Sequence, residues 1–278
     1  MTTGDPKLQT TDIGPLVSEM QFNKVQELLK SGKTVVGAAG SPVVENMSML
    51  ADSDYDFILY DTQHSPYMVK EFIPAIKAME GKKAAPMVRV SANHPDLICF
   101  ALDAGARGIV VPMVNTKEEA QAMVRACKYA PLGDRSNAGL RGDWGINVQE
   151  YSTKEKYREY LDMFNDEVVI APMIETQQAI DNIDEILSVD GIDVLLIGPS
   201  DLSIELGVSL DFEGSVYEKG LDIIAEACKR HGVVPGMYFI PPTMDPNFFV
   251  DKGYKFFTMP WAPWANQGIS NGLKSIKR

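Results

Sequence analysis

Residues 193–203 read DVLLIGPSDLS, a short apolar run followed by a glycine, a proline and polar side chains. Such a run, bounded by polar residues, is typical of a buried strand in a parallel sheet. Gly198 and Pro199 then predict a tight turn into the start of a helix. This stretch therefore indicates a strand followed directly by a helix.

The same pattern recurs along the whole chain. Amphipathic stretches that predict helices lie between the apolar runs, at residues 69–80, 96–104, 117–128, 177–187, 217–231 and 264–277. Several runs are apolar on both sides, as expected when helices cover the outside of a barrel and side chains fill its interior. Eight runs predict strands, at residues 34–38, 56–61, 86–90, 108–112, 168–174, 193–197, 233–239 and 255–259.

Eight alternating strands and helices predict an α/β fold, a single (β/α)8 barrel. Residues 16–30 predict an extra helix before the first strand. Residues 1–15 are expected to form a flexible segment, and residues 16–278 one barrel domain. Residues 129–151 have no regular pattern, and a connection of that length is usually functional or disordered.

Composition narrows the class of protein. The chain has 278 residues, a formal net charge of −12 and 45% hydrophobic residues. This acidic balance argues against nucleic acid or an anionic membrane as a partner. Cys99, Cys127 and Cys228 lie far apart, and the N-terminus has no signal-peptide pattern. We therefore expect a cytoplasmic protein that acts on a small molecule.

Polar residues follow the apolar runs, at the end of a barrel where catalytic groups lie. Glu175 follows the fifth run and Asp201 the sixth. Two carboxylates at one end of a barrel repel each other unless a proton or a cation lies between them. Oxygen ligands of this kind suit Mg²⁺ or Mn²⁺. The alternatives are an ordinary helix cap for Asp201 and an exposed acid in the first helical turn for Glu175.

Two further side chains at this end are candidates for chemistry. Arg89 ends the third run and could hold an oxoacid or an enolate oxygen, although a structural ion pair is the alternative. His64, just after the second run, could act as a general acid or base, or simply lie at the surface. Gly198, Pro199 and Ser200 lie at a predicted helix start, where free backbone N–H groups would weakly favour binding of an anionic substrate.

Other chemistries lack their motifs. A Schiff-base aldolase needs a lysine at the mouth of the barrel, and no predicted strand ends in one, because Lys33 and Lys255 lie at strand starts. The sequence also has no dinucleotide-binding, P-loop or nucleophile-elbow motif. Metal-assisted carbon chemistry is therefore favoured over imine chemistry.

Five segments also carry a family resemblance, in order and spacing. The segments are YDFILYDTQHSPY, MVRVSANHP, ALDAGARGIVVPMVNTKEEA, APMIET and IDVLLIGPSDLSIELG. They resemble the HpcH/HpaI family of metal-dependent pyruvate aldolases over about residues 34–260. The resemblance implies a (β/α)8 barrel that binds a divalent metal ion, with Mg²⁺ expected and Mn²⁺ or Co²⁺ as alternatives.

The resemblance also implies roles for particular residues. Glu175 and Asp201 would bind the metal, which pyruvate chelates, and Arg89 would contact the keto or enolate oxygen. His64 would pair with Asp103 of a neighbouring subunit and move the proton. The resemblance further implies a homo-oligomer, typically a hexamer, in which the C-terminal helix, residues 261–277, packs on a neighbour.

The sequence departs from the family pattern at three places. Gln63 replaces an acid that usually precedes the histidine, and Met173 replaces a glutamine that is frequent two residues before the metal-binding glutamate. The loop that contains Arg135, Arg141 and Trp144 does not align, so we expect it to set substrate selectivity.

The resulting hypothesis is a class II pyruvate aldolase, a lyase that cleaves or forms 4-hydroxy-2-oxoacids through a metal-bound pyruvate enolate. Its partners would be a 2-oxoacid, pyruvate or oxaloacetate, and an aldehyde. The alternative is an oxaloacetate decarboxylase, or an enzyme that forms C–C bonds as macrophomate synthase does, with the same enolate. A barrel that binds a 2-oxoacid without turnover is a third hypothesis, against which the retained site residues argue.

Overall fold

Eight parallel strands close into one barrel in the computed structural model, which describes residues 24–141 and 146–276. Each strand pairs with its neighbours in chain order, and β8 returns to β1. All eight predicted strands are confirmed, with their ends shifted by at most two residues. The strands are β1 (Val35–Ala39), β2 (Phe57–Asp61), β3 (Ala85–Arg89), β4 (Gly108–Val111), β5 (Val169–Ile174), β6 (Val194–Ile197), β7 (Val234–Met237) and β8 (Phe256–Met259).

Alternate residues of each strand divide the core into two layers. Leu59, Met87 and Leu196 belong to the cluster that fills the barrel interior. Ile58 and Val88 belong to the larger cluster between the strands and the helices. The period of two therefore makes each strand apolar on both sides, which is why these runs can be recognised in the sequence.

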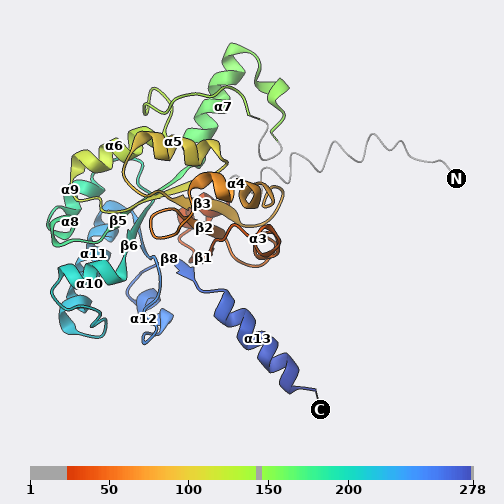
Figure 1. Ribbon diagram of the computed structural model, residues 1–278. Coiled ribbons are helices and arrows are strands. Elements are labelled where there is room, and N and C mark those ends of the chain that lie inside the picture. The colour runs from red at the N-terminus through yellow and green to blue at the C-terminus, as the bar shows by residue number, and fades with distance from the viewer. Residues whose placement is uncertain (1–23, 142–145, 277–278) are drawn as a thin grey trace.

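Helices surround the strands (Figure 1). Those in the described ranges are α2 (Lys24–Lys30), α3 (Val44–Ala51), α4 (Val69–Lys77), α5 (Pro95–Asp103), α6 (Lys117–Cys127), α7 (Lys154–Glu167), α8 (Gln177–Asp181), α9 (Ile183–Leu187), α10 (Pro199–Glu205), α11 (Ser215–His231), α12 (Pro246–Asp251) and α13 (Ala262–Lys274), with a short 3-10 helix, η2 (Val148–Tyr151).

Several helices differ from the prediction. The helix predicted at residues 177–187 is two helices, because the chain breaks at Asn182, which caps α9. Helices α3, α7 and α12 were not predicted, and only the start of α10 was. The predicted helix at 16–30 is present as Lys24–Lys30, while residues 16–23 and the segment 1–15 lie outside the described residues.

The connection at residues 129–151 is held at several points rather than running free. Asn165 of α7 bonds both backbone groups of Tyr129, with distances of 2.7 Å to the N–H and 3.2 Å to the carbonyl oxygen. Farther along, the backbone N–H of Arg141 donates to the buried Tyr160 hydroxyl at 3.0 Å. The described part of this connection is therefore fixed against α7.

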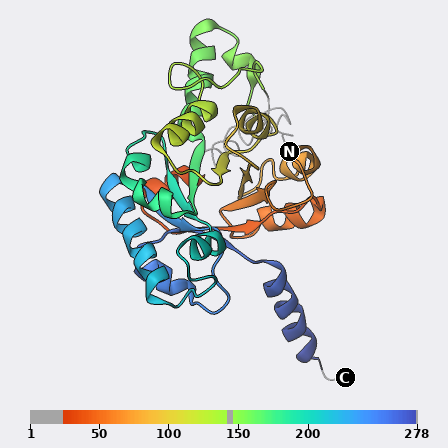
Figure 2. The ribbon, with the colours of Figure 1, turned by 60° about the vertical axis from the view of Figure 1, so that its left-hand side comes forward.

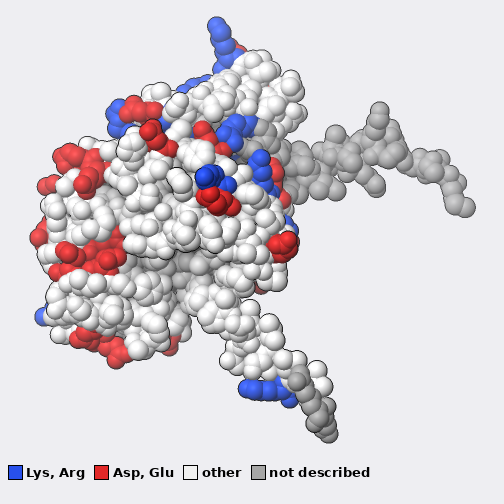
Figure 3. Space-filling model, viewed as in Figure 1, with Lys and Arg blue, Asp and Glu red and all other residues white. Residues whose placement is uncertain are grey.

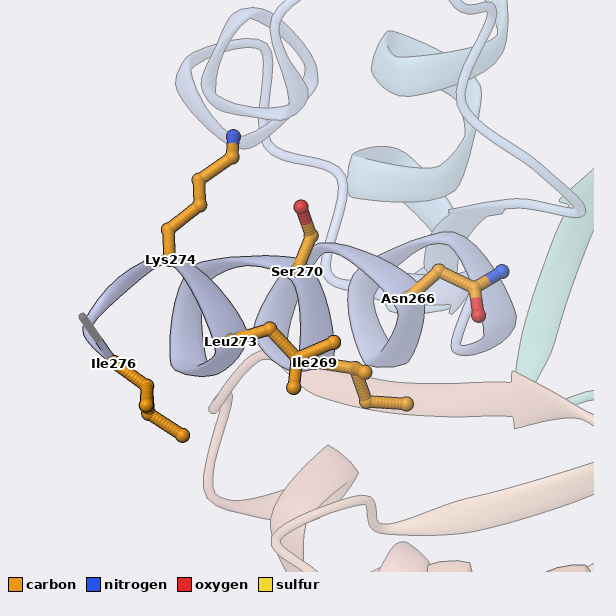
Figure 4. Close-up of a pocket in the computed structure, with 6 residues that line it drawn as sticks. All are labelled: Asn266, Ile269, Ser270, Leu273, Lys274 and Ile276. Carbon is orange, nitrogen blue, oxygen red and sulfur yellow. The ribbon is translucent and has the colours of Figure 1, made fainter. Parts of the chain in front are cut away.

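Helix α13 extends away from the barrel (Figure 2). None of its residues is buried, and Ile269 is 62% exposed. Figure 4 shows Ile269 and Leu273 on one side of the helix and Ser270 and Lys274 on the other. This helix therefore presents an apolar stripe that nothing in the described chain covers.

Charge is distributed unevenly over the surface. Figure 3 shows Asp and Glu side chains gathered on the side that carries α8, α9 and α10. Helix α13 contains no acidic residue, and Lys274 is its only charged one. In residues 24–141 and 146–276, no helix has the length and apolar character needed to span a bilayer.

Candidate active site

The inward-facing rows of the strands continue into charged and polar side chains at one end of the barrel. Leu59 is followed two residues later by Asp61, Met87 by Arg89 and Met173 by Glu175, so each keeps the phase of the interior cluster. Because all the strands are parallel, these carboxyl ends meet at the same mouth of the barrel. The site is thus a direct continuation of the core pattern.

Glu175 is the most deeply buried acid of the site, with 1% of its surface exposed. Its Oε2 accepts a hydrogen bond of 2.9 Å from the backbone N–H of Met113. Burial raises the pKa of Glu175, the Met113 N–H lowers it, Asp201 raises it and Arg89 lowers it, with a net shift upward. A cation beside this carboxylate would offset both its burial and the repulsion from Asp201.

Met113 reaches Glu175 through an unusual backbone conformation. Its φ is +56°, in the left-handed region that costs a residue with a side chain about 1–2 kcal/mol. In that conformation the backbone N–H of Met113 points toward the carboxylate of Glu175. Backbone strain is therefore present at the contact that orients the Glu175 carboxylate.

Gly198 forms the other wall around Glu175. A Cβ at residue 198 would lie 2.1 Å from Glu175 Oε1, so only glycine leaves room for the carboxylate. Gly198 is also the N-cap of α10, whose first turn carries Asp201 as an exposed side chain. Pro199 and Ser200 complete this turn. Two carboxylates beside a cradle that only glycine permits are a donor set that fits a hard divalent cation completed by water or substrate.

Arg89 is buried, 3% exposed, and forms a bidentate pair with Asp61. Its Nε donates to Asp61 Oδ1 at 2.8 Å and its Nη2 to Oδ2 at 2.6 Å. The two residues are register partners on β3 and β2, so the strand pairing itself aligns them. The alternative of a structural ion pair is therefore realised, and it leaves Nη1 directed toward the thioether of Met173, 3.9 Å away on β5.

Asp61 stays ionised because of this pairing. Burial alone would raise its pKa, but the hydrogen bond and charge of Arg89, with the N–H groups of Gln63 and His64, hold it below its ordinary value. An ionised Asp61 accepts the hydrogen bonds of Nε and Nη2 along one edge of the Arg89 guanidinium. The faces of the guanidinium and its Nη1 edge are then available to other groups.

Tyr238, which the sequence analysis missed, covers the face of Arg89. The guanidinium carbon lies 3.9 Å from the centre of the Tyr238 ring, a cation–π contact worth about 0.5–2 kcal/mol. The available signal was the period of two on β7, because Val234, Gly236 and Tyr238 share one phase and the first and last pack against the interior cluster.

The structure places the other predicted residues on connecting loops and at the end of a helix. His64 is exposed in the loop after β2. Asp103, the last residue of α5, accepts a hydrogen bond of 2.8 Å from Arg135 Nη2, and Arg141 Nη1 lies 3.9 Å from the same carboxylate. Arg135 also stacks on Tyr129, with its guanidinium carbon 4.6 Å from the ring centre. Trp144 lies outside the described residues.

These features define a (β/α)8-barrel protein with a carboxylate pair and a fixed guanidinium at the carboxyl ends of its strands. A family model described as HpcH/HpaI aldolase/citrate lyase matches residues 41–260. The chain belongs to this family. The expected resemblance is thereby confirmed.

Known relatives agree with this assignment. The hydroxypyruvate/pyruvate aldolase of Rhizorhabdus wittichii is 41% identical over 187 residues, which is 67% of this chain and 70% of that protein. The structure of an HpcH/HpaI aldolase from Desulfitobacterium hafniense matches with a TM-score of 0.78 and 26% identity, covering 91% of this chain and 96% of that one.

A third relative extends the range of chemistry. The structure of macrophomate synthase matches with a TM-score of 0.72 and 25% identity, over 92% of this chain and 90% of that one. The protein is an enzyme, a lyase of the oxoacid aldolase type.

Proposed function

We propose that this protein is a divalent-metal-dependent aldolase that cleaves or forms 4-hydroxy-2-oxoacids by way of the pyruvate enolate. Its small-molecule partners are a 2-oxoacid and an aldehyde, and Mg²⁺ is the expected ion, with Mn²⁺ or Co²⁺ as alternatives. The proposal rests on one observation above all: Glu175 is buried in a space that only glycine at residue 198 permits, with Asp201 close enough to raise its pKa.

Glu175 and Asp201 would hold the metal ion. Such an ion supplies a Lewis acid that draws electron density from the 2-oxo group. The nearly complete burial of Glu175 keeps its charge in a medium of low dielectric constant, where its attraction for a cation is stronger than in water. Asp201, on the first turn of α10, meets solvent and leaves room for exchangeable ligands.

Arg89 would bind the oxygen on which negative charge develops. When the C3–C4 bond breaks, its electron pair passes into the enolate, and the aldehyde leaves. Asp61 holds the guanidinium before substrate arrives, so this stabilisation requires no reorganisation during the reaction. Protonation of the enolate at C3 then gives pyruvate.

His64 would move the proton of the 4-hydroxyl group. In the cleavage direction it accepts that proton as the aldehyde carbonyl forms, and in the reverse direction it returns the proton. We propose that Asp103 of a neighbouring subunit orients His64. In the subunit itself Asp103 is already held by Arg135, which fixes the carboxylate in place.

The connection at residues 129–151, between α6 and α7, would determine which aldehyde is accepted. Arg135 and Arg141 both lie on it and both approach Asp103, while Trp144 is a candidate from its sequence position. Both guanidinium groups can bind carboxylates, so these two arginines are the residues through which we propose that the connection acts on selectivity.

A second candidate function uses the same enolate. Loss of CO₂ from oxaloacetate, or formation of a new C–C bond, would need the same metal and guanidinium groups, and the likeness to macrophomate synthase favours keeping this candidate. Measurement of CO₂ release from oxaloacetate against aldehyde release from a 4-hydroxy-2-oxoacid separates the two.

We also propose that the protein is a cytoplasmic homo-oligomer, expected to be a hexamer, in which α13 packs on a neighbouring copy. The exposed stripe of Ile269, Leu273 and Ile276 supports the contact between copies. The free thiols of Cys99, Cys127 and Cys228 agree with a reducing compartment.

The decisive experiment follows exchange of the C3 protons of pyruvate with D₂O by NMR, with Mg²⁺ present. Wild type is expected to exchange these protons, and Glu175→Gln to lose at least about 100-fold of the rate, because the acid that holds the cation is gone. Glu205→Gln, at the exposed end of α10, is the matched control and should match wild type. Full exchange in EDTA would contradict the proposal.

A further inference from the structure

Tyr238 stands two residues beyond Gly236 on the inward row of β7, on the barrel wall beside Arg89. It belongs to none of the segments that carry the family resemblance, and nothing above gives it a role in the chemistry. Its surroundings are nonetheless those of the site: the charges of Arg89, Asp61 and Glu175 all act on its hydroxyl group. It is therefore a residue of the site whose role is still to be explained.

Asp61 and Tyr238 constrain the guanidinium of Arg89 in two different directions. The fork from Nε and Nη2 to the two oxygens of Asp61 fixes rotation within the guanidinium plane. The ring of Tyr238, 3.9 Å from the guanidinium carbon, blocks tilting out of that plane. Either contact alone would leave one rotation free.

The hydroxyl group of Tyr238 lies within the field of both members of the ion pair. The charges of Arg89 and Asp61 both act on it. Burial raises the pKa of Tyr238 well above its ordinary value, while Arg89 opposes this shift and Asp61 adds to it. A phenylalanine at this position would keep the ring over Arg89 and remove only the hydroxyl group.

The direction left open by these constraints is that of Nη1. In the described part of the chain its recorded contact is the thioether of Met173, a weak acceptor, 3.9 Å away on the strand that leads to Glu175. The N–H groups of Nη1 thus retain capacity to donate to an oxygen lying between β3 and β5. This is the position at which a bound oxoacid would meet Glu175.

We propose that Tyr238 is a positioning residue that, together with Asp61, fixes the Arg89 guanidinium so that Nη1 points at the substrate oxygen on which charge develops. This inference rests on the proposed enolate chemistry for its consequence in catalysis. The structural part of the inference, that Tyr238 and Asp61 hold the guanidinium in one orientation, does not depend on which reaction the enzyme performs.

The kinetic test compares Tyr238→Phe and Tyr238→Leu in the pyruvate exchange assay. Because a displacement of about 1 Å can cost about 100-fold in rate, Tyr238→Leu should lower kcat by about 100-fold, and Tyr238→Phe, which keeps the ring over Arg89, by less than about 10-fold. KM for pyruvate should change less than about 3-fold, because the lost interaction acts mainly as charge develops. Affinity for oxalate, a planar mimic of the enolate, should fall in parallel with kcat.

Tyr217→Phe is the matched control. Tyr217 is fully buried, and its hydroxyl has no hydrogen-bond partner in the described part of the chain, so its loss should leave kcat and oxalate affinity unchanged. A Tyr238→Leu variant that lowers Tm but keeps wild-type kcat and oxalate affinity would show that the tyrosine only stabilises the fold, and would overturn the proposal.

A double-mutant comparison tests whether Tyr238 acts through Arg89. In an Arg89→Lys background the planar fork is already lost, so Tyr238→Leu should add less than about 3-fold to the loss. If the double variant instead lost the product of the two single-variant fold-losses in kcat, the proposal would be overturned.

A crystal structure of Tyr238→Leu separates this inference from the proposed function. A guanidinium displaced from its wild-type orientation supports positioning even if wild type proves inactive on pyruvate. A guanidinium unchanged on Asp61 overturns the inference even if wild type exchanges pyruvate protons.

Discussion

The carboxylate of Glu175 and the α-carbon of Gly198 are so close that residue 198 has no space for a methyl group. Gly198 has φ −90° and ψ 98°, an extended conformation that alanine adopts without strain. The glycine is needed at this position because of its missing side chain and not because of its backbone freedom. This distinction makes the position useful for a test.

Gly198→Ala is expected to displace the Glu175 carboxylate and to lower the rate of pyruvate exchange by at least about 100-fold, since the cation site loses its geometry. The fold should persist, with an unchanged circular dichroism spectrum. Gly268→Ala on α13, where no atom lies within 4 Å of the added carbon, is the control. Activity of Gly198→Ala close to wild type would mean that this carboxylate does not hold the metal.

Some of the individual residues of the candidate site were predicted from the sequence. Glu175, Asp201 and Arg89 were predicted because each follows an apolar run, where charge is conspicuous. Tyr238 was missed because an aromatic residue at a strand end is indistinguishable from core until the phase of β7 is known. The positive φ of Met113 has no signal in its residue type, because methionine rarely adopts that conformation.

Among the elements, strands were predicted more successfully than helices. A strand that is apolar on both sides stands out from its surroundings, whatever its partners. Helix α7 is mostly polar, and Tyr160 and Asn165 are its only buried residues, so it has little of the periodicity by which helices are recognised. The break at Asn182 depends on tertiary contact, because the amide of that residue donates to the carbonyl of Asn115 at 2.8 Å.

Asn165 gives α7 its hold on the connection that follows α6. Asn165→Ala leaves a buried N–H and a buried carbonyl of Tyr129 without partners, so we expect a loss of about 2–3 kcal/mol in the free energy of unfolding. Urea denaturation measures this loss. Ser136→Ala, at an exposed position on the same connection, should cost less than about 0.5 kcal/mol. Equal losses in the two variants would show that Asn165 does not anchor the connection.

The whole molecule combines a closed barrel with α13, a helix of which the described chain buries no residue. Closure was predictable, because eight strand–helix units give a barrel its natural number. The surface against which α13 packs was not predictable. An amphipathic stripe does not reveal whether that surface belongs to the same copy of the chain or to another. The exposed apolar side chains of α13, Trp264, Ile269 and Leu273, together with Ile276 just after it, show only that the described part of one subunit leaves them uncovered.

Replacement of Ile269 and Leu273 by aspartate is expected to reduce the proposed homo-oligomer to smaller species, because charge would be placed on the apolar stripe. Light scattering after size-exclusion chromatography measures the mass. Asn266→Asp and Ser270→Asp, on the other side of the helix, control for added charge. An unchanged mass for the Ile269 and Leu273 variant would exclude α13 from the contact.

The register pairing of Asp61 with Arg89 has a consequence for how the barrel folds. A slip of one residue between β2 and β3 would turn one of these charges toward the apolar layer beneath the helices. An unpaired buried charge costs about 3–5 kcal/mol, so misregistered intermediates are disfavoured before the last strand joins the first. The ion pair that orients the Arg89 guanidinium thus also selects the correct alignment of its two strands during folding.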